Sequence, residues 1–169
     1  FEANKDWLLP NAVSPTSGKM ILPIQSYLVR TKHHTILIDT CVGCHKKFKW
    51  VPDWNDRRDD TYLRNLKAAG VDPTEIDYVF CTHLHVDHCG WNTKLEDGRW
   101  VPTFPNAKYI FSQPEYESHA ESNNIVFRES VLPIMEAKQA ELVAMDFALD
   151  DNISLTPTPG HTAGHVAVQ

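Results

Sequence analysis

The sequence predicts a single α/β domain spanning residues 1–169. Two observations carry this prediction: the length suits about one domain, and β-rich segments alternate with helical ones along the chain. Hydrophobic residues make up 42%, an ordinary value for a globular protein. The net charge of −6 argues against nucleic acid as a partner, and no run approaches the ~18 apolar residues of a membrane span.

The first half of the chain predicts two strands and a helix. Residues 20–30 and 35–39 read as strands, and residues 31–34 between them are typical of a hairpin connection. Residues 59–69 predict a helix, because aspartates begin the segment, leucines recur at helical spacing and Gly70 follows its end.

The second half continues the alternation. Residues 76–82 and 107–111 are predicted strands, and a helix is expected to open near Ser112. A further helical segment is expected over about 128–140, and residues 153–158 form the last predicted strand, which leads into Pro-Gly. This succession of strands and helices is an α/β pattern.

The densest chemical signal is the segment 82–90, Thr-His-Leu-His-Val-Asp-His-Cys-Gly, which follows a predicted strand. His83 and His85 point to the same side if the backbone is extended. Asp87 and His88 are adjacent, so they provide a second direction of ligation if the chain turns there. The pattern predicts two neighbouring cation sites, and its ligands favour zinc, with iron or manganese as alternatives. A histidine run that merely faces solvent or the core is the plain alternative.

His-x-His-x-Asp-His after a hydrophobic strand resembles the signature of the metallo-β-lactamase superfamily. Two further segments support the resemblance. Leu-Ile-Asp-Thr at 37–40 looks like the family's earlier strand-end aspartate, and Thr-Pro-Gly-His-Thr-Ala-Gly-His at 158–165 looks like its later Pro-Gly-His motif. The three segments stand in the family's order between about residue 20 and residue 169.

The resemblance implies a set of metal ligands. His83, His85 and His161 would hold the first metal ion, and Asp87 and His88 would hold the second. Three protein ligands leave one position open, as in catalytic zinc sites. Asp87 would also be the catalytic group that accepts and returns a proton.

Two residues would support the ligands. Asp39 would orient a ligand histidine from behind, with an ordinary turn-capping carboxylate as an equal alternative. His165 stands four residues after His161, but Gly164 and the strand-like residues after it argue against a helical ligand pair. We therefore expect His165 to support or pack against the site.

The resemblance also implies an αβ/βα sandwich. In that fold a metal-bridging aspartate and a further histidine follow the next strand, and no residue stands after Gln169 in this sequence. We therefore expect the C-terminal part of the fold to be missing, with the single domain continuing beyond residue 169.

The implied activity is hydrolysis, in which a metal-bound hydroxide attacks a carbonyl group. A lactone or ester is the leading substrate class. A thioester, as in glyoxalase II-like relatives, a β-lactam, and a mono-iron dioxygenase of the same fold are the alternatives. Small molecules are the expected partners, with no nucleic acid, no membrane and no prediction of oligomeric state. Four cysteines and the lack of a visible signal peptide favour the cytoplasm, although a missing N-terminus leaves export open.

Two readings other than an enzyme remain. Cys41, Cys44 and His45 match the Cys-x-x-Cys-His pattern of c-type haem attachment, which would make the protein an electron carrier. The pattern is short and no axial ligand stands in a recognisable context, so this reading is disfavoured. The other reading is an inactive fragment.

The segment 45–58 combines basic and aromatic side chains. Phe48, Trp50 and Trp54 predict an apolar wall beside the substrate, with plain packing against the body as an equal alternative. Interleaved aspartates cancel the positive charge, which disfavours a nucleic-acid strip.

Overall fold

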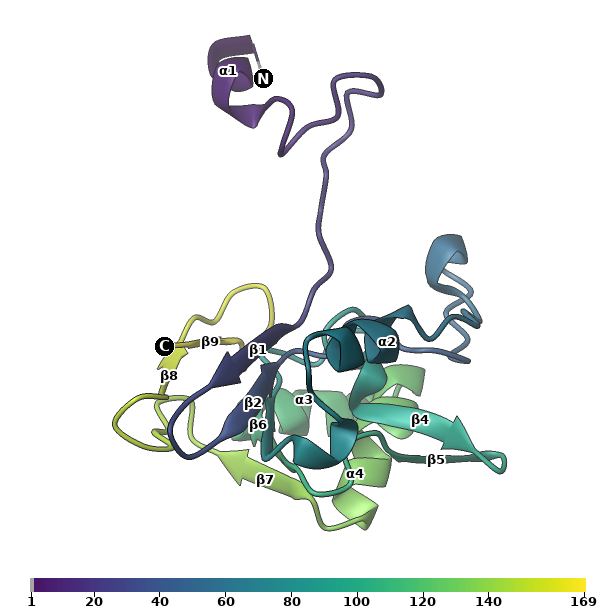
Figure 1. Ribbon diagram of the computed structural model, residues 1–169, viewed down its shortest axis with the longest axis vertical. Helices are drawn as coiled ribbons and strands as arrows, with labels where there is room; N and C mark the ends of the chain where they lie inside the picture. Colours follow the sequence, from purple (N-terminus) through teal and green to yellow (C-terminus); the bar gives the residue numbers. More distant parts are fainter. Residues whose placement is uncertain (1) are drawn as a thin grey trace.

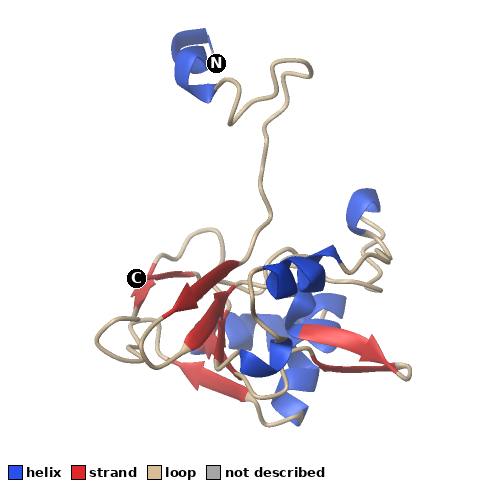
Figure 2. Cartoon of the chain, viewed as in Figure 1, coloured by secondary structure: helices blue, strands red, loops and turns tan. Residues whose placement is uncertain are grey.

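The computed structural model describes residues 2–169 and confirms the α/β class (Figures 1 and 2). Its centre is a five-stranded sheet in the order β1-β2-β3-β6-β7. The strands of this sheet are β1 (Tyr27–Arg30), β2 (Thr35–Ile38), β3 (Tyr78–Phe80), β6 (Lys108–Ser112) and β7 (Ala140–Val143).

The strand directions follow from the lengths of the connections. β1 and β2 pair antiparallel across the predicted hairpin, and the other three pairs are parallel. Parallel neighbours need a long crossover. The crossovers contain the helices α2 (Thr61–Ala68), α3 (Gln113–Ser122) and α4 (Leu132–Glu136).

The alternation of side chains along the strands divides the core into two parts. Leu37 and Tyr109 are fully buried on the face that α2, α3 and α4 cover. Ile36 and Ile110 are fully buried on the opposite face, against the antiparallel hairpin β8 (Leu155–Pro157) and β9 (Val166–Val168). The sheet is therefore a rigid layer with packed side chains on both sides.

A second hairpin lies between β3 and β6 and was not predicted. It consists of β4 (Thr93–Glu96) and β5 (Arg99–Pro102), paired antiparallel. The remaining elements are short: η1 (Glu2–Asn4), α1 (Lys5–Leu8), η2 (Pro52–Trp54), η3 (Pro73–Glu75), η4 (Gly90–Asn92) and a π-helical turn, η5 (Phe127–Val131). Among residues 2–169, no helix has the length and apolar character that a membrane crossing requires.

The strand predicted over residues 20–30 is much shorter in the structure. Only Tyr27–Arg30 joins the sheet, and the N-terminal part of the chain, drawn in purple, stands away from the body (Figure 1). Pro23 has no N–H to donate to a ladder, and Met20 pairs only through an isolated bridge to Val13. The apolar pattern of this segment reflects exposed side chains, since Leu22 is 73% exposed.

The helix predicted over residues 128–140 is interrupted and ends early. A π-helical turn precedes α4, and Pro133 at the start of α4 has no N–H for a regular helical bond. Lys138 has a φ of +59°, a left-handed conformation that cannot continue a helix.

Candidate metal centre

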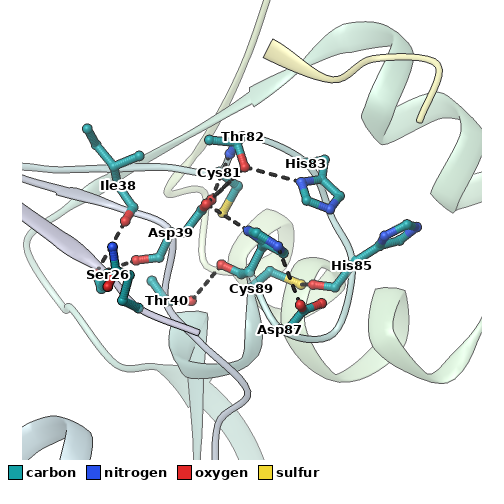
Figure 3. A network of polar contacts seen from close by, with 12 residues as sticks. Ser26, Ile38, Asp39, Thr40, Cys81, Thr82, His83, His85, Asp87 and Cys89 are labelled. Atoms are coloured by element: carbon teal, nitrogen blue, oxygen red, sulfur yellow. Dashed lines mark hydrogen bonds and ion pairs between the residues drawn. The ribbon is translucent and has the colours of Figure 1, made fainter. Parts of the chain in front are cut away.

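The candidate site lies where two parallel strands end. Asp39 follows β2, and the loop that contains His83, His85 and His88 follows β3 (Figure 3). The carboxyl ends of parallel neighbours meet at one edge of a sheet, which is where α/β folds place their sites. The third contributor is the turn between β8 and β9, which brings His161 to the same edge.

The structure brings His83, His85 and His161 together. One ring nitrogen from each lies within 4.8 Å of the other two. The ring centroids are 4.7 Å apart for His83 and His85, 4.8 Å for His83 and His161, and 4.7 Å for His85 and His161. Three imidazoles from two distant segments of the chain therefore converge on one point, and His85 Nδ1 is only 3.0 Å from His161 Nε2, 76 residues later in the sequence.

The environment of His83 suits a bound cation. Its Nδ1 lies 3.2 Å from the Thr82 hydroxyl, whereas its Nε2 is buried and has no hydrogen-bond partner among the described residues. Burial and the adjacent imidazoles lower the pKa of His83 to about 2, so the ring is neutral near pH 7. A neutral imidazole with a free buried nitrogen is what a metal ion requires, so the donor set fits a divalent cation.

Asp39 holds the loop after β3 from behind (Figure 3). One carboxylate oxygen accepts the backbone N–H of Thr82 at 2.8 Å, and the other lies 2.7 Å from His88 Nδ1. The residue is buried and has a φ of +59°. Asp39 therefore contacts both the backbone of the loop and the ring of His88, and its role in orienting a ligand histidine stays a prediction.

Asp87 and His88 lie together on the side of His88 away from Asp39. His88 Nε2 is 3.5 Å from an Asp87 carboxylate oxygen. Burial lowers the pKa of His88, but hydrogen bonds and charge from Asp39 and Asp87 outweigh it and raise the pKa to about 9. Asp87 and His88 thus form a second cluster of one carboxylate and one imidazole. The ring centroid of His88 is 4.0 Å from that of His83.

His165 lies beside the three histidines and outside their cluster. Its ring centroid is 4.9 Å from that of His83, and its Nδ1 lies 2.7 Å from the Thr158 hydroxyl. The packing or supporting role of His165 stays a prediction.

A cavity of about 400 Å³ opens beside the histidines. Trp50 and Trp54 from the segment 45–58 form part of its wall, next to His85 and Asp87. The prediction for Phe48 is corrected by the structure. Phe48 is 0% exposed and lies in the core cluster, because its ring turns inward from the same loop.

The Cys-x-x-Cys-His segment forms a turn in which Cys41, Gly43 and His45 have positive φ angles. Cys44 is buried and its thiol donates to the Asp59 carbonyl. Burial and the charge of Asp39 raise the pKa of Cys41 to about 11, so that thiol stays protonated. A Cβ on Gly43 would lie 2.6 Å from the Gly90 carbonyl oxygen, so this turn packs directly against the start of η4.

Two residues beside the histidines were not predicted from the sequence. His119 lines the cavity, and its ring centroid is 6.2 Å from that of His85. Glu115 is buried and accepts hydrogen bonds from both histidine-bearing loops. Both lie on α3, whose sequence reads as an ordinary polar helix, so only the fold reveals them.

Comparison with known proteins decides the family. Residues 21–169 match the sequence profile described as the metallo-beta-lactamase superfamily. The chain belongs to the metallo-β-lactamase superfamily. The predicted family is thereby confirmed, and with it the αβ/βα fold class.

The sequence relatives of the chain include proteins named as N-acyl homoserine lactonases. The N-acyl homoserine lactonase AiiA of Bacillus thuringiensis subsp. kurstaki is 28% identical over 163 residues, which cover 89% of this chain and 59% of AiiA. An N-acyl homoserine lactonase of a Bacillus species matches with the same values. The chain therefore spans 59% of the length of the curated relatives it matches.

Solved structures of hydrolases match the fold. A probable metal-dependent hydrolase from Staphylococcus aureus has a TM-score of 0.75 at 20% identity, and the match covers 98% of this chain and 59% of that protein. An N-acyl homoserine lactone hydrolase, solved with N-hexanoyl-L-homoserine at its catalytic metal centre, has a TM-score of 0.65 at 25% identity. That match covers 94% of this chain and 63% of the hydrolase.

Proposed function

We propose that the protein is a metal-dependent hydrolase that opens lactones carrying an acyl chain. The observation that carries the proposal is the convergence of His83, His85 and His161 beside an apolar cavity. Relatives named as N-acyl homoserine lactonases support the same substrate class. A lactone is the lead substrate class, and thioesters and β-lactams are the less favoured alternatives.

The proposed metal is zinc, with two ions in the complete site. His83, His85 and His161 would hold one ion, and Asp87 and His88 would contribute to the other. Imidazole with carboxylate is a ligand set that zinc favours. When bound, such ions polarise an ester carbonyl and lower the pKa of water toward neutrality.

The chain's own residues prepare this chemistry. Thr82 occupies Nδ1 of His83 and leaves Nε2 directed at the ligand position. Asp39 fixes the ring of His88 through Nδ1, which leaves Nε2 toward Asp87. Both arrangements determine which nitrogen is available, as supporting partners of metal ligands commonly do.

Asp87 is the proposed proton carrier. Hydrogen bonding to His88 lowers the pKa of Asp87 despite its partial burial, so the carboxylate is ionised at neutral pH. It can accept the proton of the attacking water and return it to the ring oxygen as the carbon–oxygen bond of the lactone breaks. The products are one carboxylate and one hydroxyl group on the same molecule.

The cavity is the proposed acyl-chain site. Its wall includes Trp50, Trp54 and Val126, and it borders His85 and Asp87. Apolar walls with a few polar groups at one end are typical of small-molecule sites. An acyl chain in this cavity would bring its lactone ring to the histidines.

The test is the rate of ring opening of N-hexanoyl-homoserine lactone, followed as acid release at constant pH. The zinc-loaded protein should hydrolyse the lactone, and removal of zinc with dipicolinate should abolish turnover until zinc is restored. Asp87→Asn should reduce kcat by at least about 100-fold, the usual contribution of a general base.

The matched control is Asp97→Asn, which changes an exposed aspartate in the turn between β4 and β5. It should retain the activity of the wild type. Full turnover after chelation, or an Asp87→Asn variant as active as the control, would contradict the proposal.

A further inference from the structure

A buried carboxylate joins the two segments that carry the three clustered histidines. Glu115 of α3 is 2% exposed. One of its oxygens accepts the N–H of Leu84 at 2.9 Å, and the other accepts the N–H of Gly164 at 3.0 Å. Leu84 stands between His83 and His85 in the sequence, so each carboxylate oxygen binds one of the two loops.

The first residues of α3 bind Gly164 and do not cap their own helix. Ser112-Gln113-Pro114-Glu115 matches the Ser-x-x-Glu capping box, in which the two side chains bond the first turn of their own helix. In the structure Ser112 makes no cap bond, and its hydroxyl donates to the Gly164 carbonyl at 2.6 Å. Both the N–H and the carbonyl group of Gly164 are thus held from the start of α3.

The contact is too close for any side chain at residue 164. A Cβ on Gly164 would lie 2.2 Å from the Glu115 backbone nitrogen and 2.6 Å from its Cα. The loop that carries His161 and His165 therefore rests directly on α3. Glycine is required here for the close approach of two backbones.

Other contacts do not replace Glu115. The N–H of Val166 donates to the Thr82 carbonyl at 3.0 Å, which joins the same two segments on the β9 side. His119, one turn along α3, lies 3.6 Å from the Glu115 carboxylate, but its Nδ1 bonds the Glu115 carbonyl at 3.0 Å. Glu115 is the side chain that binds the backbone between His83 and His85 and, at the same time, the backbone of Gly164.

We propose that Glu115 is a positioning residue that fixes His161 relative to His83 and His85 and so sets the affinity of the three-histidine centre for metal. The inference rests on the proposed function, because it requires a metal at these histidines. A buried carboxylate is costly unless it is well bonded. Here its two hydrogen bonds hold the loop of His83 and His85 in a fixed position relative to the loop of His161.

The test is a Co²⁺ titration of the full chain, read from the visible absorption of the bound ion, for wild type and Glu115→Gln. The amide has nearly the same shape, but its single oxygen can accept only one of the two N–H groups, and its NH₂ faces the other donor. We expect Glu115→Gln to weaken Co²⁺ binding by about 10–100-fold, as the loss of a ligand-supporting partner commonly does.

The matched control is Glu117→Gln, on the exposed part of the same helix, where the carboxylate bonds only the side chain of Gln113. It should bind Co²⁺ like the wild type. The melting temperature of each metal-free protein is measured beside the titration, because a purely structural Glu115 would lower that temperature and leave the Co²⁺ affinity of the folded protein unchanged.

The outcomes separate the two proposals. If the wild type binds no Co²⁺, the proposed function fails. If the wild type and Glu115→Gln bind with equal affinity, only the role of Glu115 fails. Should Glu115→Gln not fold, Ser112→Ala decides the matter, because it removes one bond to Gly164. A loss of about fivefold, the value of one net hydrogen bond, supports the inference, and an unchanged affinity overturns it.

Discussion

Replacing Lys46 with methionine should remove a pH-dependent part of the stability between pH 7 and pH 9. The Lys46 side chain is 1% exposed, although it belongs to the segment 45–58 that carries Trp50 and Trp54. Its Nζ donates to the Thr93 hydroxyl at 2.9 Å and to the Glu129 carbonyl at 3.0 Å. It therefore anchors the cavity-wall segment to the body of the protein.

The magnitude follows from the pKa of Lys46. Burial lowers this pKa from 10.5 to about 7, although Cys89 and Glu129 act in the opposite direction. Between pH 7 and about 10 the unfolded chain binds a proton that the folded chain does not, so stability rises with pH in this window and is lost as the pH falls toward 7. Integration from pH 7 to pH 9 gives about 2 kcal/mol for this one group.

The assay is urea unfolding at both pH values, followed by tryptophan fluorescence. Lys46→Met keeps the length of the side chain, and the Thr93 hydroxyl retains its own bond to the Glu129 carbonyl. The wild type should gain about 2 kcal/mol relative to Lys46→Met between pH 7 and pH 9. Lys47→Met, at an exposed neighbouring position, is the control and should follow the wild type. Equal pH dependence in all three proteins would refute the reasoning.

Three further predictions concern the site and its walls. Asp39→Asn should weaken zinc binding at His88 by about 10–100-fold, measured by competition with a chromophoric chelator; unchanged affinity would assign Asp39 to turn capping. Gly90→Ala should lower the free energy of unfolding, measured in urea, by at least about 3 kcal/mol, since a Cβ there would lie 1.9 Å from the Val42 carbonyl. A much smaller loss would mean that the backbone of this turn shifts to make room for the Cβ. Trp54→Ala should raise KM about tenfold for a decanoyl lactone and far less for a butanoyl lactone, because it removes apolar cavity wall; equal effects on both would place the acyl chain elsewhere.

Local patterns were sufficient for the first two histidines. His83 and His85 could be placed on one side because an extended backbone alternates its side chains, whereas Asp39 was linked to them only through the resemblance to the superfamily. The structure brings these residues to one edge of the sheet, as expected. The ligand roles themselves remain a proposal.

Residues whose direction depends on packing could not be predicted in this way. Phe48, Trp50 and Trp54 have similar composition and spacing, yet only the two tryptophans reach the cavity and Phe48 is buried. The direction of each ring depends on contacts with the body that sequence spacing does not encode. The first strand was overestimated for a related reason, since its apolar residues 20–22 have no partner strand in the structure.

Glu115 shows how a local signal can mislead. Its sequence context predicts a capping box, and tertiary hydrogen bonds to Leu84 and Gly164 take the place of the cap. Departures of this kind are expected where a fold supports a functional site. No spacing rule would have linked residue 115 to loops 31 and 49 positions away.

The central claim is that the three clustered histidines bind a metal ion, and a zinc titration of wild type beside His161→Ala tests it most directly. His161 is exposed and makes its contact with His85 through the ring alone, so its removal should leave the fold intact. The wild type should bind zinc tightly, and the variant should lose at least about 100-fold in zinc affinity. Equal zinc affinity in the two proteins, or no zinc binding by either, would contradict it.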